Sequence, residues 1–222
     1  MLKLRPESNL TDRRESLRDS PVFSNVTGFG GDGNMEGPES VGDGHCVTDG
    51  PFADLILPYY NSDDHDHCLS RAFADGKTRG TLPGDQVRPT VVEEILSQTD
   101  YKSFFLQLEK GPHNQIPNGI GGDFLKFTAP NDPLFFLHHG YLSSCSITST
   151  GLIFLVRQLD RLWWMWQRAN PEARKRDYGG ISRHASKVPA SLQDAIPMGN
   201  LSSAIRVIDM MDTETGMLCY TY

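Results

Sequence analysis

The chain has 222 residues, of which 38% are hydrophobic and 22% are charged, and this composition favours one large domain with a packed core. Its formal net charge of -7 provides no basic surface for nucleic acid or an anionic membrane. No apolar run reaches the roughly 20 residues that span a bilayer, since the best one covers only 151–156. The polar residues 1–19 lack the apolar stretch of a secretory signal, so the cellular compartment stays open.

Cysteines and glycosylation triplets leave the compartment open as well. Four cysteines in a chain of this size do not form a disulfide scaffold, and spacing alone does not establish a Cys46–Cys68 pair. The Asn-x-Ser/Thr triplets begin at Asn9, Asn25 and Asn200. Each triplet permits N-glycosylation, although such triplets are common by chance.

Glycines dominate the segment 28–50, which contains 8 of them in 23 residues and is predicted to be loop. Its start, Gly28-Phe-Gly-Gly-Asp-Gly33, fits the dinucleotide-binding pattern G-x-G-x-x-G. That pattern requires a strand before it and a helix after it. Because Asn34-Met-Glu-Gly-Pro38 opens a helix poorly, the sequence favours a coiled surface loop.

Helix signals begin at Thr90. The run Thr90-Val-Val-Glu93 has the spacing of a capping box at the start of an apolar stripe. Thr99 or Asp100 is expected to cap a second helix, which Gly111-Pro112 is expected to end. The residues predicted on the buried side of this second helix are Phe104, Phe105 and Leu108.

Two further helices are predicted downstream. A glycine-rich loop at 118–122 precedes Asp132, which is expected to cap a helix over 134–139 with Pro133 at its first position. A fourth helix is expected over 159–169, ended by Pro171. Its apolar stripe consists of Leu159, Leu162, Trp163 and Trp166. The tail 205–222 is predicted to form one or two short strands with a turn at 214–216.

The sequence contains seven histidines, which are candidate metal ligands, and two of them are favoured for that role. A single histidine is more often a hydrogen-bonded core or surface residue than a metal ligand. His113 and His139 differ because each lies in the helical block beside glycine or proline residues that fix the backbone, and Phe135 lies one turn before His139. Imidazole suits copper, zinc and iron, so the residues alone do not select a metal. The histidines are His45, His65, His67, His113, His138, His139 and His184.

Four segments together resemble the second copper site of tyrosinases and catechol oxidases, in particular the fungal members. They are Gly111-Pro-His-Asn114, Ile120-Gly-Gly-Asp-Phe124, Ala129-Pro-Asn-Asp-Pro-Leu-Phe-Phe-Leu-His-His139 and Leu159-Asp-Arg-Leu-Trp-Trp-Met-Trp-Gln167. The ending Leu218-Cys-Tyr-Thr-Tyr222 resembles the Tyr-x-Tyr closure of that domain. Ser20-Pro-Val-Phe23 and Gly28-Phe-Gly-Gly31 resemble the stretch after the first copper site, so the resemblance covers nearly the whole chain.

The resemblance implies a mainly α fold. It implies a partial four-helix-bundle type 3 copper domain with long Gly/Pro-rich loops and a short C-terminal β segment. In the intact family two coppers, each held by three histidines, react with dioxygen to oxidise phenols or o-diphenols to o-quinones. Phenolic substrate and dioxygen are therefore the expected partners, without nucleic acid or membrane.

By the same resemblance, individual residues receive roles. His113 and His139 match copper B ligands, whereas His138 matches an adjacent histidine that is usually not a ligand. Glu109 and Asn114 match the pair that holds a water for deprotonating the incoming phenol, a general-base role. Tyr220 and Tyr222 match the closing motif.

Departures from the family pattern lower the copper expected here to one ion or none. In the family, the copper A histidines lie before the position that corresponds to residue 1 of this sequence. The copper A site is therefore expected to be missing here. His45, His65 and His67 are expected to be solvated loop histidines and not substitutes, because bundle sites take ligands from facing helices. Pro117 stands where many members have the second histidine of His-x-x-x-His, which leaves the third copper B ligand open, with His138 the nearest spare candidate.

An insert is the last departure. The family joins His-His to Leu-Asp-Arg through two residues, whereas this chain uses 140–158. Residues 141–157 are therefore an atypical insert, either translated intron or a surface loop. The chain is then a single incomplete tyrosinase copper-binding domain, 1–222, with a loop-rich region (1–88), a helical copper B region (89–170) and a closing segment (171–222).

Three functions remain at this point. The first is a tyrosinase-like copper oxidoreductase, and the second is a truncated or mis-spliced remnant that binds at most one metal ion, the outcome expected for this particular chain. The third, an unrelated metal hydrolase, is least favoured because the sequence has no His-Glu-x-x-His cluster.

Overall fold

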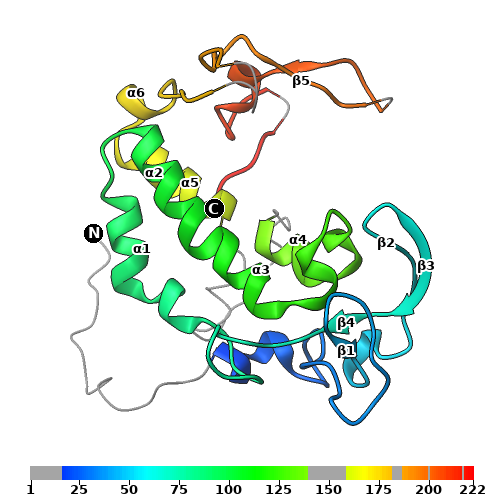
Figure 1. Ribbon diagram of the computed structural model, residues 1–222. Helices are drawn as coiled ribbons and strands as arrows, with labels where there is room; N and C mark the ends of the chain where they lie inside the picture. Colours follow the sequence, from blue (N-terminus) through cyan, green and yellow to red (C-terminus); the bar gives the residue numbers. More distant parts are fainter. Residues whose placement is uncertain (1–16, 140–158, 182–186, 200, 217) are drawn as a thin grey trace.

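The computed structural model describes residues 17–139, 159–181, 187–199, 201–216 and 218–222 (Figure 1). The predicted insert 141–157 lies outside these residues, as do His184 and the asparagines of two glycosylation triplets, Asn9 and Asn200. No described helix is long and apolar enough to cross a membrane.

Helices supply most of the regular structure, as the mainly α prediction requires. The α-helices are α1 (Pro89–Leu96), α2 (Tyr101–Leu108), α3 (Asn114–Ile120), α4 (Leu134–His139), α5 (Leu159–Ala169) and α6 (Pro171–Arg174), and a π-helical turn (Glu109–His113) joins α2 to α3. Short 3-10 helices cover Leu17–Asp19, Pro21–Phe23, Gly50–Phe52, Gly84–Val87, Gly122–Leu125, Ala129–Asn131 and Val207–Met210. In Figure 1, α2 and α3 follow one another as a single bent rod, with α1 on one side of it and the β2–β3 strands on the other.

Three small antiparallel pairs of strands complete the described structure. They are β1 (His45–Cys46) with β4 (Ser70–Arg71), β2 (Ile56–Tyr60) with β3 (Asp63–Cys68), and β5 (Ala195–Ile196) with β6 (Ile205–Arg206). The β2–β3 hairpin was not predicted, because β3 is almost entirely polar and lacks the apolar alternation of a half-buried strand. Among the described residues of the tail 205–222, β6 is a strand, and the residues after it form a 3-10 helix and turns.

One helical core joins α1, α2 and α5. Ile95, Phe104 and Trp166 are buried together, and the Phe104 and Trp166 rings stack with their centroids 4.7 Å apart. The bounds predicted for the fourth helix are confirmed, and Leu159, Leu162 and Trp166 are buried as expected. The Trp166 indole Nε1 donates a hydrogen bond to the Gln98 carbonyl, just after the end of α1. The buried indole N–H is therefore hydrogen-bonded inside the core.

A second core lies under α3 and α4. It contains Phe73, Ile120, Phe124 and Leu134, packed against residues of the first two 3-10 helices. The first core packs α2 against α1 and α5, and the second packs α3 against α4, so the bent rod α2–α3 is held at both of its ends.

Helix ends test the local predictions directly. Asp100 caps α2, since its Oδ1 accepts the Ser103 backbone N–H at 2.9 Å, and this resolves the choice between Thr99 and Asp100. The capping box at Thr90 is wrong, because α1 already begins at Pro89 and Arg88 occupies the cap position without a side-chain hydrogen bond. Proline at the first helical position supplies the fixed φ that starts the helix one residue earlier.

Three other predictions in this region are corrected. Phe105 is 42% exposed and faces away from the buried side of α2. Gly111-Pro112 bends the helical rod but does not end it, because the π-helical turn absorbs the non-helical backbone at Gly111 (φ -88°, ψ -115°). Helical structure consequently continues through much of the predicted loop 118–122, to Ile120, before Gly121 turns the chain with φ 68°.

Candidate copper site

The bend between α2 and α3 positions His113. Pro117 lies inside α3 and has no N–H to donate to the carbonyl four residues earlier, which is that of His113. In the structure this carbonyl oxygen accepts a hydrogen bond from His138 Nε2 on α4 at 3.2 Å. The proline that occupies the place of a family ligand thus makes a backbone acceptor available to α4.

Helix α4 begins as predicted. Asp132 Oδ1 accepts the Leu134 backbone N–H at 2.9 Å, with Pro133 between the two. Phe135 lies one turn before His139, and their rings approach to 4.4 Å between centroids, the contact that the sequence suggested. The cap and the aromatic contact together fix the direction of the His139 imidazole.

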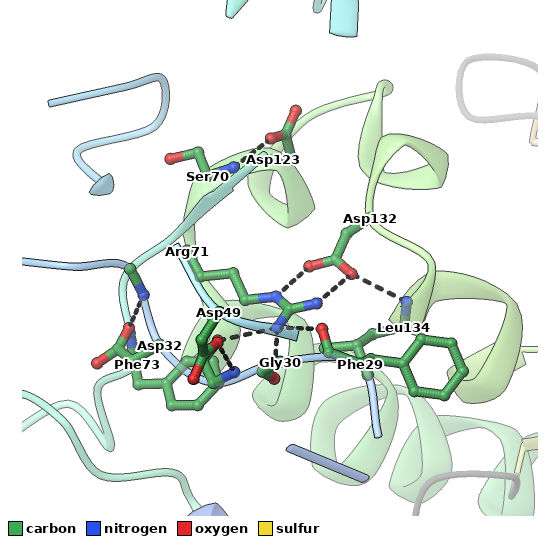
Figure 2. Close-up of polar contacts among 12 residues, drawn as sticks. Phe29, Gly30, Asp32, Asp49, Ser70, Arg71, Phe73, Asp123, Asp132 and Leu134 are labelled. Atoms are coloured by element: carbon green, nitrogen blue, oxygen red, sulfur yellow. Dashed lines mark hydrogen bonds and ion pairs between the residues drawn. The ribbon is translucent and has the colours of Figure 1, made fainter. Parts of the chain in front are cut away.

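Arg71 contacts the residue that caps the start of α4 (Figure 2). Its guanidinium is fully buried and pairs with the carboxylate of Asp132, Nε to Oδ2 at 2.7 Å and Nη2 to Oδ1 at 3.0 Å. Its Nη1 donates to backbone carbonyl oxygens of the glycine-rich loop, those of Phe29, Gly30 and Gly31. One side chain therefore joins that loop, strand β4 and the helix that carries His138 and His139. The segment 28–33 is a loop, as predicted, but Gly30 and Gly33 are buried, so it does not lie wholly on the surface.

His113 and His139 meet between the rod and α4. Their ring centroids lie 5.1 Å apart and the ring planes cross at 81°. The structure therefore brings together, from two helical elements, the two histidines that the sequence selected.

Glu109 and Asn114 both lie against one nitrogen of His113. Nδ1 of His113 is 2.9 Å from Asn114 Oδ1 and 3.5 Å from Glu109 Oε2. An oxygen acceptor requires Nδ1 to carry the proton, which leaves the Nε2 lone pair as the ligand atom. Both residues thus lie at the candidate site, and their contact with His113 orients the imidazole.

Burial keeps the α4 histidines neutral. Burial, with a smaller contribution from the neighbouring His139, lowers the pKa of His138 to about 4. The pKa of His139 is lowered by burial first and then by the charge of His113. Metal binding requires the neutral imidazole, so neither ring must lose a proton at neutral pH to act as a ligand.

His138 is committed to a different contact. It is 3% exposed, its Nε2 donates to the His113 carbonyl, and its ring crosses that of His139 at 82° with centroids 4.9 Å apart. Its Nε2 therefore links α4 to the bent rod.

The remaining described histidines correct part of the prediction of solvated loop residues. His65 is exposed as expected, but it lies with His67 on strand β3, and His45 lies on β1. His67 is 7% exposed, its Nδ1 is 2.6 Å from the His65 carbonyl oxygen, and its Nε2 is 3.0 Å from Asp123 Oδ1. No local pattern predicts this contact, because Asp123 lies 56 positions from His67.

Among the described residues, no group of three or more His, Cys, Asp or Glu side chains is arranged to hold a metal ion. The donor chemistry of His113 and His139 suits copper. However, two imidazoles are one fewer than the three that the family resemblance implies for each copper. The described site therefore fits one copper incompletely.

The C-terminal tyrosines close on α5. Tyr220 and Tyr222 each donate their hydroxyl to Asp160 Oδ2, at 2.6 Å and 2.5 Å. The sequence resemblance pointed to these tyrosines as a closing motif but did not identify Asp160 as the acceptor.

A helix-rich domain in which two helices converge on paired histidines is typical of helical metal-binding oxidoreductases. Comparisons with known proteins define the class further. The family described as the common central domain of tyrosinase matches residues 9–145, more than half of the chain. The chain belongs to the tyrosinase family.

Fungal proteins are among its relatives. The chain is 41% identical over 207 residues to tyrosinase ustQ of Aspergillus flavus and 40% identical over 223 aligned residues to the tyrosinase-like protein phomQ1 of Diaporthe leptostromiformis. Each alignment covers 93% of this chain and 53% of the relative, so the chain spans about half the length of these proteins. The structure of a mutant polyphenol oxidase from Thermothelomyces thermophila is similar, with a TM-score of 0.66 and 25% identity over 94% of this chain and 63% of that one.

Proposed function

We propose that this chain forms part of a tyrosinase-like copper oxidoreductase that oxidises phenols or o-diphenols to o-quinones with dioxygen. The observation that carries the proposal is the convergence of His113 and His139, 5.1 Å apart between ring centroids, from two helical elements of a tyrosinase-family domain. The relatives named tyrosinase and polyphenol oxidase support the same class of reaction.

Each residue of the site has a proposed task. Nε2 of His113 and the imidazole of His139 would hold one copper ion, which would supply one-electron redox chemistry toward dioxygen. Glu109 and Asn114 hold the water that deprotonates the incoming phenol. The Glu109 carboxylate is the general base that receives the proton. The Glu109 side chain is 38% exposed, which leaves its carboxylate accessible to an incoming phenol.

A second candidate is a non-catalytic domain that binds a single metal ion. The absence of a three-ligand group among the described residues favours it. Two-imidazole coordination can retain an ion without creating the paired-copper arrangement that the family uses for dioxygen.

Copper titration with activity measurements separates the two candidates. Purified chain is titrated anaerobically with Cu(I), and bound copper, oxygen uptake and quinone formation from an o-diphenol are measured. Oxygen uptake with quinone formation supports the oxidoreductase, whereas one copper or none without oxygen uptake supports the non-catalytic domain and overturns the first proposal for this chain. H113A and H139A are expected to lose the copper that wild type binds, and E109Q to keep it while losing turnover.

H65A is the matched control, because His65 is an exposed histidine on β3 outside the candidate site. Its copper stoichiometry is expected to equal that of wild type. Equal copper binding by wild type, H113A and H139A would contradict the assignment of the site.

A further inference from the structure

One of the three Asn-x-Ser/Thr triplets lies on a well-described surface turn. Asn25-Val26-Thr27 directly follows the 3-10 helix Pro21–Phe23, and all three residues are exposed, with Val26 at 84%. The Ser24 hydroxyl oxygen accepts the backbone N–H groups of Val26 and Thr27, each at 3.2 Å, and shapes the turn. The Asn25 side chain forms no hydrogen bond with another described residue, so its amide is available.

A disulfide provides the second, independent observation. Cys46 and Cys68 are bonded, and they join β1 to the end of β3. Disulfides form and persist in oxidising compartments and are rare where thiols are kept reduced. A chain that forms this bond as it matures therefore passes through the kind of compartment in which asparagine triplets receive glycans.

We propose that Asn25 is an N-glycosylation site. In the transfer, the Asn25 amide nitrogen Nδ2 loses one proton and forms a bond to the anomeric carbon of an oligosaccharide. The bond that breaks joins this carbon to the pyrophosphate of a lipid-linked donor, and the lipid pyrophosphate leaves with the electron pair. No oxidation or reduction takes place, and Thr27 supplies the hydroxyl that the triplet requires.

The folded chain accommodates a glycan at this turn without rearrangement. Val22 and Phe23, which precede the triplet, point into the core and are at most 8% exposed, whereas the triplet faces outward. An attached sugar would cover the exposed Val26 side chain and leave the core contacts unchanged.

Site-specific mass spectrometry of the protein from the organism that produces it tests the proposal. Chymotrypsin cleaves after Phe23 and Phe29, so the denatured protein yields the peptide Ser24–Phe29, which contains this triplet alone. Treatment with peptide N-glycosidase in H₂¹⁸O converts a glycosylated asparagine to an aspartate that carries ¹⁸O. We expect this label at position 25, and a peptide with unmodified asparagine throughout would overturn the proposal.

Variants of Thr27 provide the control, because they leave Asn25 in place. T27S keeps a hydroxyl at the required position and is expected to retain the label, whereas T27A is expected to lose it. Label retained in T27A would show a modification that does not depend on the triplet, and would also overturn the proposal. The outcome is independent of the proposed oxidase activity, because none of these measurements depends on copper.

Discussion

The buried Arg71 side chain connects three segments of this domain, namely the glycine-rich loop, strand β4 and the start of α4. Arg71 and Asp132 both have fully buried side chains, and Asp132 also caps α4. Removing one partner of a buried ion pair leaves an uncompensated charge, which is costlier than the net contribution of the intact pair. The arginine was not predicted as a site residue, because nothing local in the sequence links it to an aspartate 61 positions away.

We expect R71M to lower the free energy of unfolding by about 3 to 5 kcal/mol, because Asp132 would remain buried without its partner. Denaturant titration followed by circular dichroism measures the change. K175M is the matched control, since it removes the partly exposed Lys175–Asp212 pair and is expected to cost no more than about 1 kcal/mol. Equal losses in the two variants would contradict the role assigned to Arg71.

Ionisation of Tyr101 is expected to make the free energy of unfolding fall at alkaline pH. Burial raises the pKa of Tyr101 to about 12, with smaller contributions from Tyr178 and Asp177. The unfolded chain ionises this phenol near 10, whereas the folded chain keeps it protonated, so stability falls as pH rises between about 10 and 12. The loss is at most about 2 to 3 kcal/mol for a shift of this size, and solvent screening of the partly exposed side chain reduces it.

Comparison of wild type with Y101F measures this contribution. Unfolding free energies are recorded below and above the window, and Y101F is expected to lose less stability than wild type on going to the higher pH. A wild-type decrease equal to that of Y101F would show that Tyr101 ionises alike in the folded and unfolded chains.

Local chemistry predicted the starts of α2, α4 and α5 but not how the helical structure continues from α2 into α3. Asp100 and Asp132 were found from capping preferences, and the limits of α5 from its apolar stripe. The continuation through Gly111-Pro112 was missed, because a glycine–proline pair ordinarily ends a helix and only tertiary contacts select a π-helical bend. The convergence of His113 and His139 depends on that bend, so the sequence predicted the two residues but not the geometry that brings them together.

The cap of α2 gives a test at this scale. We expect D100A to lower the free energy of unfolding by about 1 kcal/mol, because the Ser103 N–H loses its acceptor at the helix start. T99A is the control, since Thr99 is exposed and is not the cap residue, and it is expected to change stability by less than about 0.5 kcal/mol. A larger effect for T99A would reverse the assignment of the cap.

At the scale of the whole molecule, contacts between distant segments determine the fold. The Cys46–Cys68 bond, the β2–β3 hairpin and the burial of His67 against Asp123 all lie in regions whose sequence predicted loops. Polar residues on β3 gave no periodic signal, and their pairing follows from contacts that a local pattern does not contain. The mainly α class was nevertheless predicted correctly, because it depends on helices with strong local signals.

The contact of the C-terminal tyrosines with Asp160 on α5 is expected to raise the free energy of unfolding of the whole domain. Two tyrosine hydroxyls donate to one carboxylate oxygen of Asp160, so the double variant Y220F/Y222F is expected to lower the free energy of unfolding by about 1.5 kcal/mol or more. The same variant is expected to increase hydrogen exchange in α5. Y59F, at a tyrosine 53% exposed, serves as control and is expected to change neither quantity. Unchanged exchange in α5 would show that the closure does not hold this helix.

Pro117 has a consequence for attempts to engineer the site. P117H would rebuild the His-x-x-x-His spacing of the family, and it would also introduce a backbone amide four residues after His113. That new amide would compete with His138 for the same carbonyl oxygen, because a regular helix pairs exactly these two positions. Adding a third imidazole to the proposed copper site would therefore require a second substitution that re-anchors α4, since P117H alone would release the helix that carries His139.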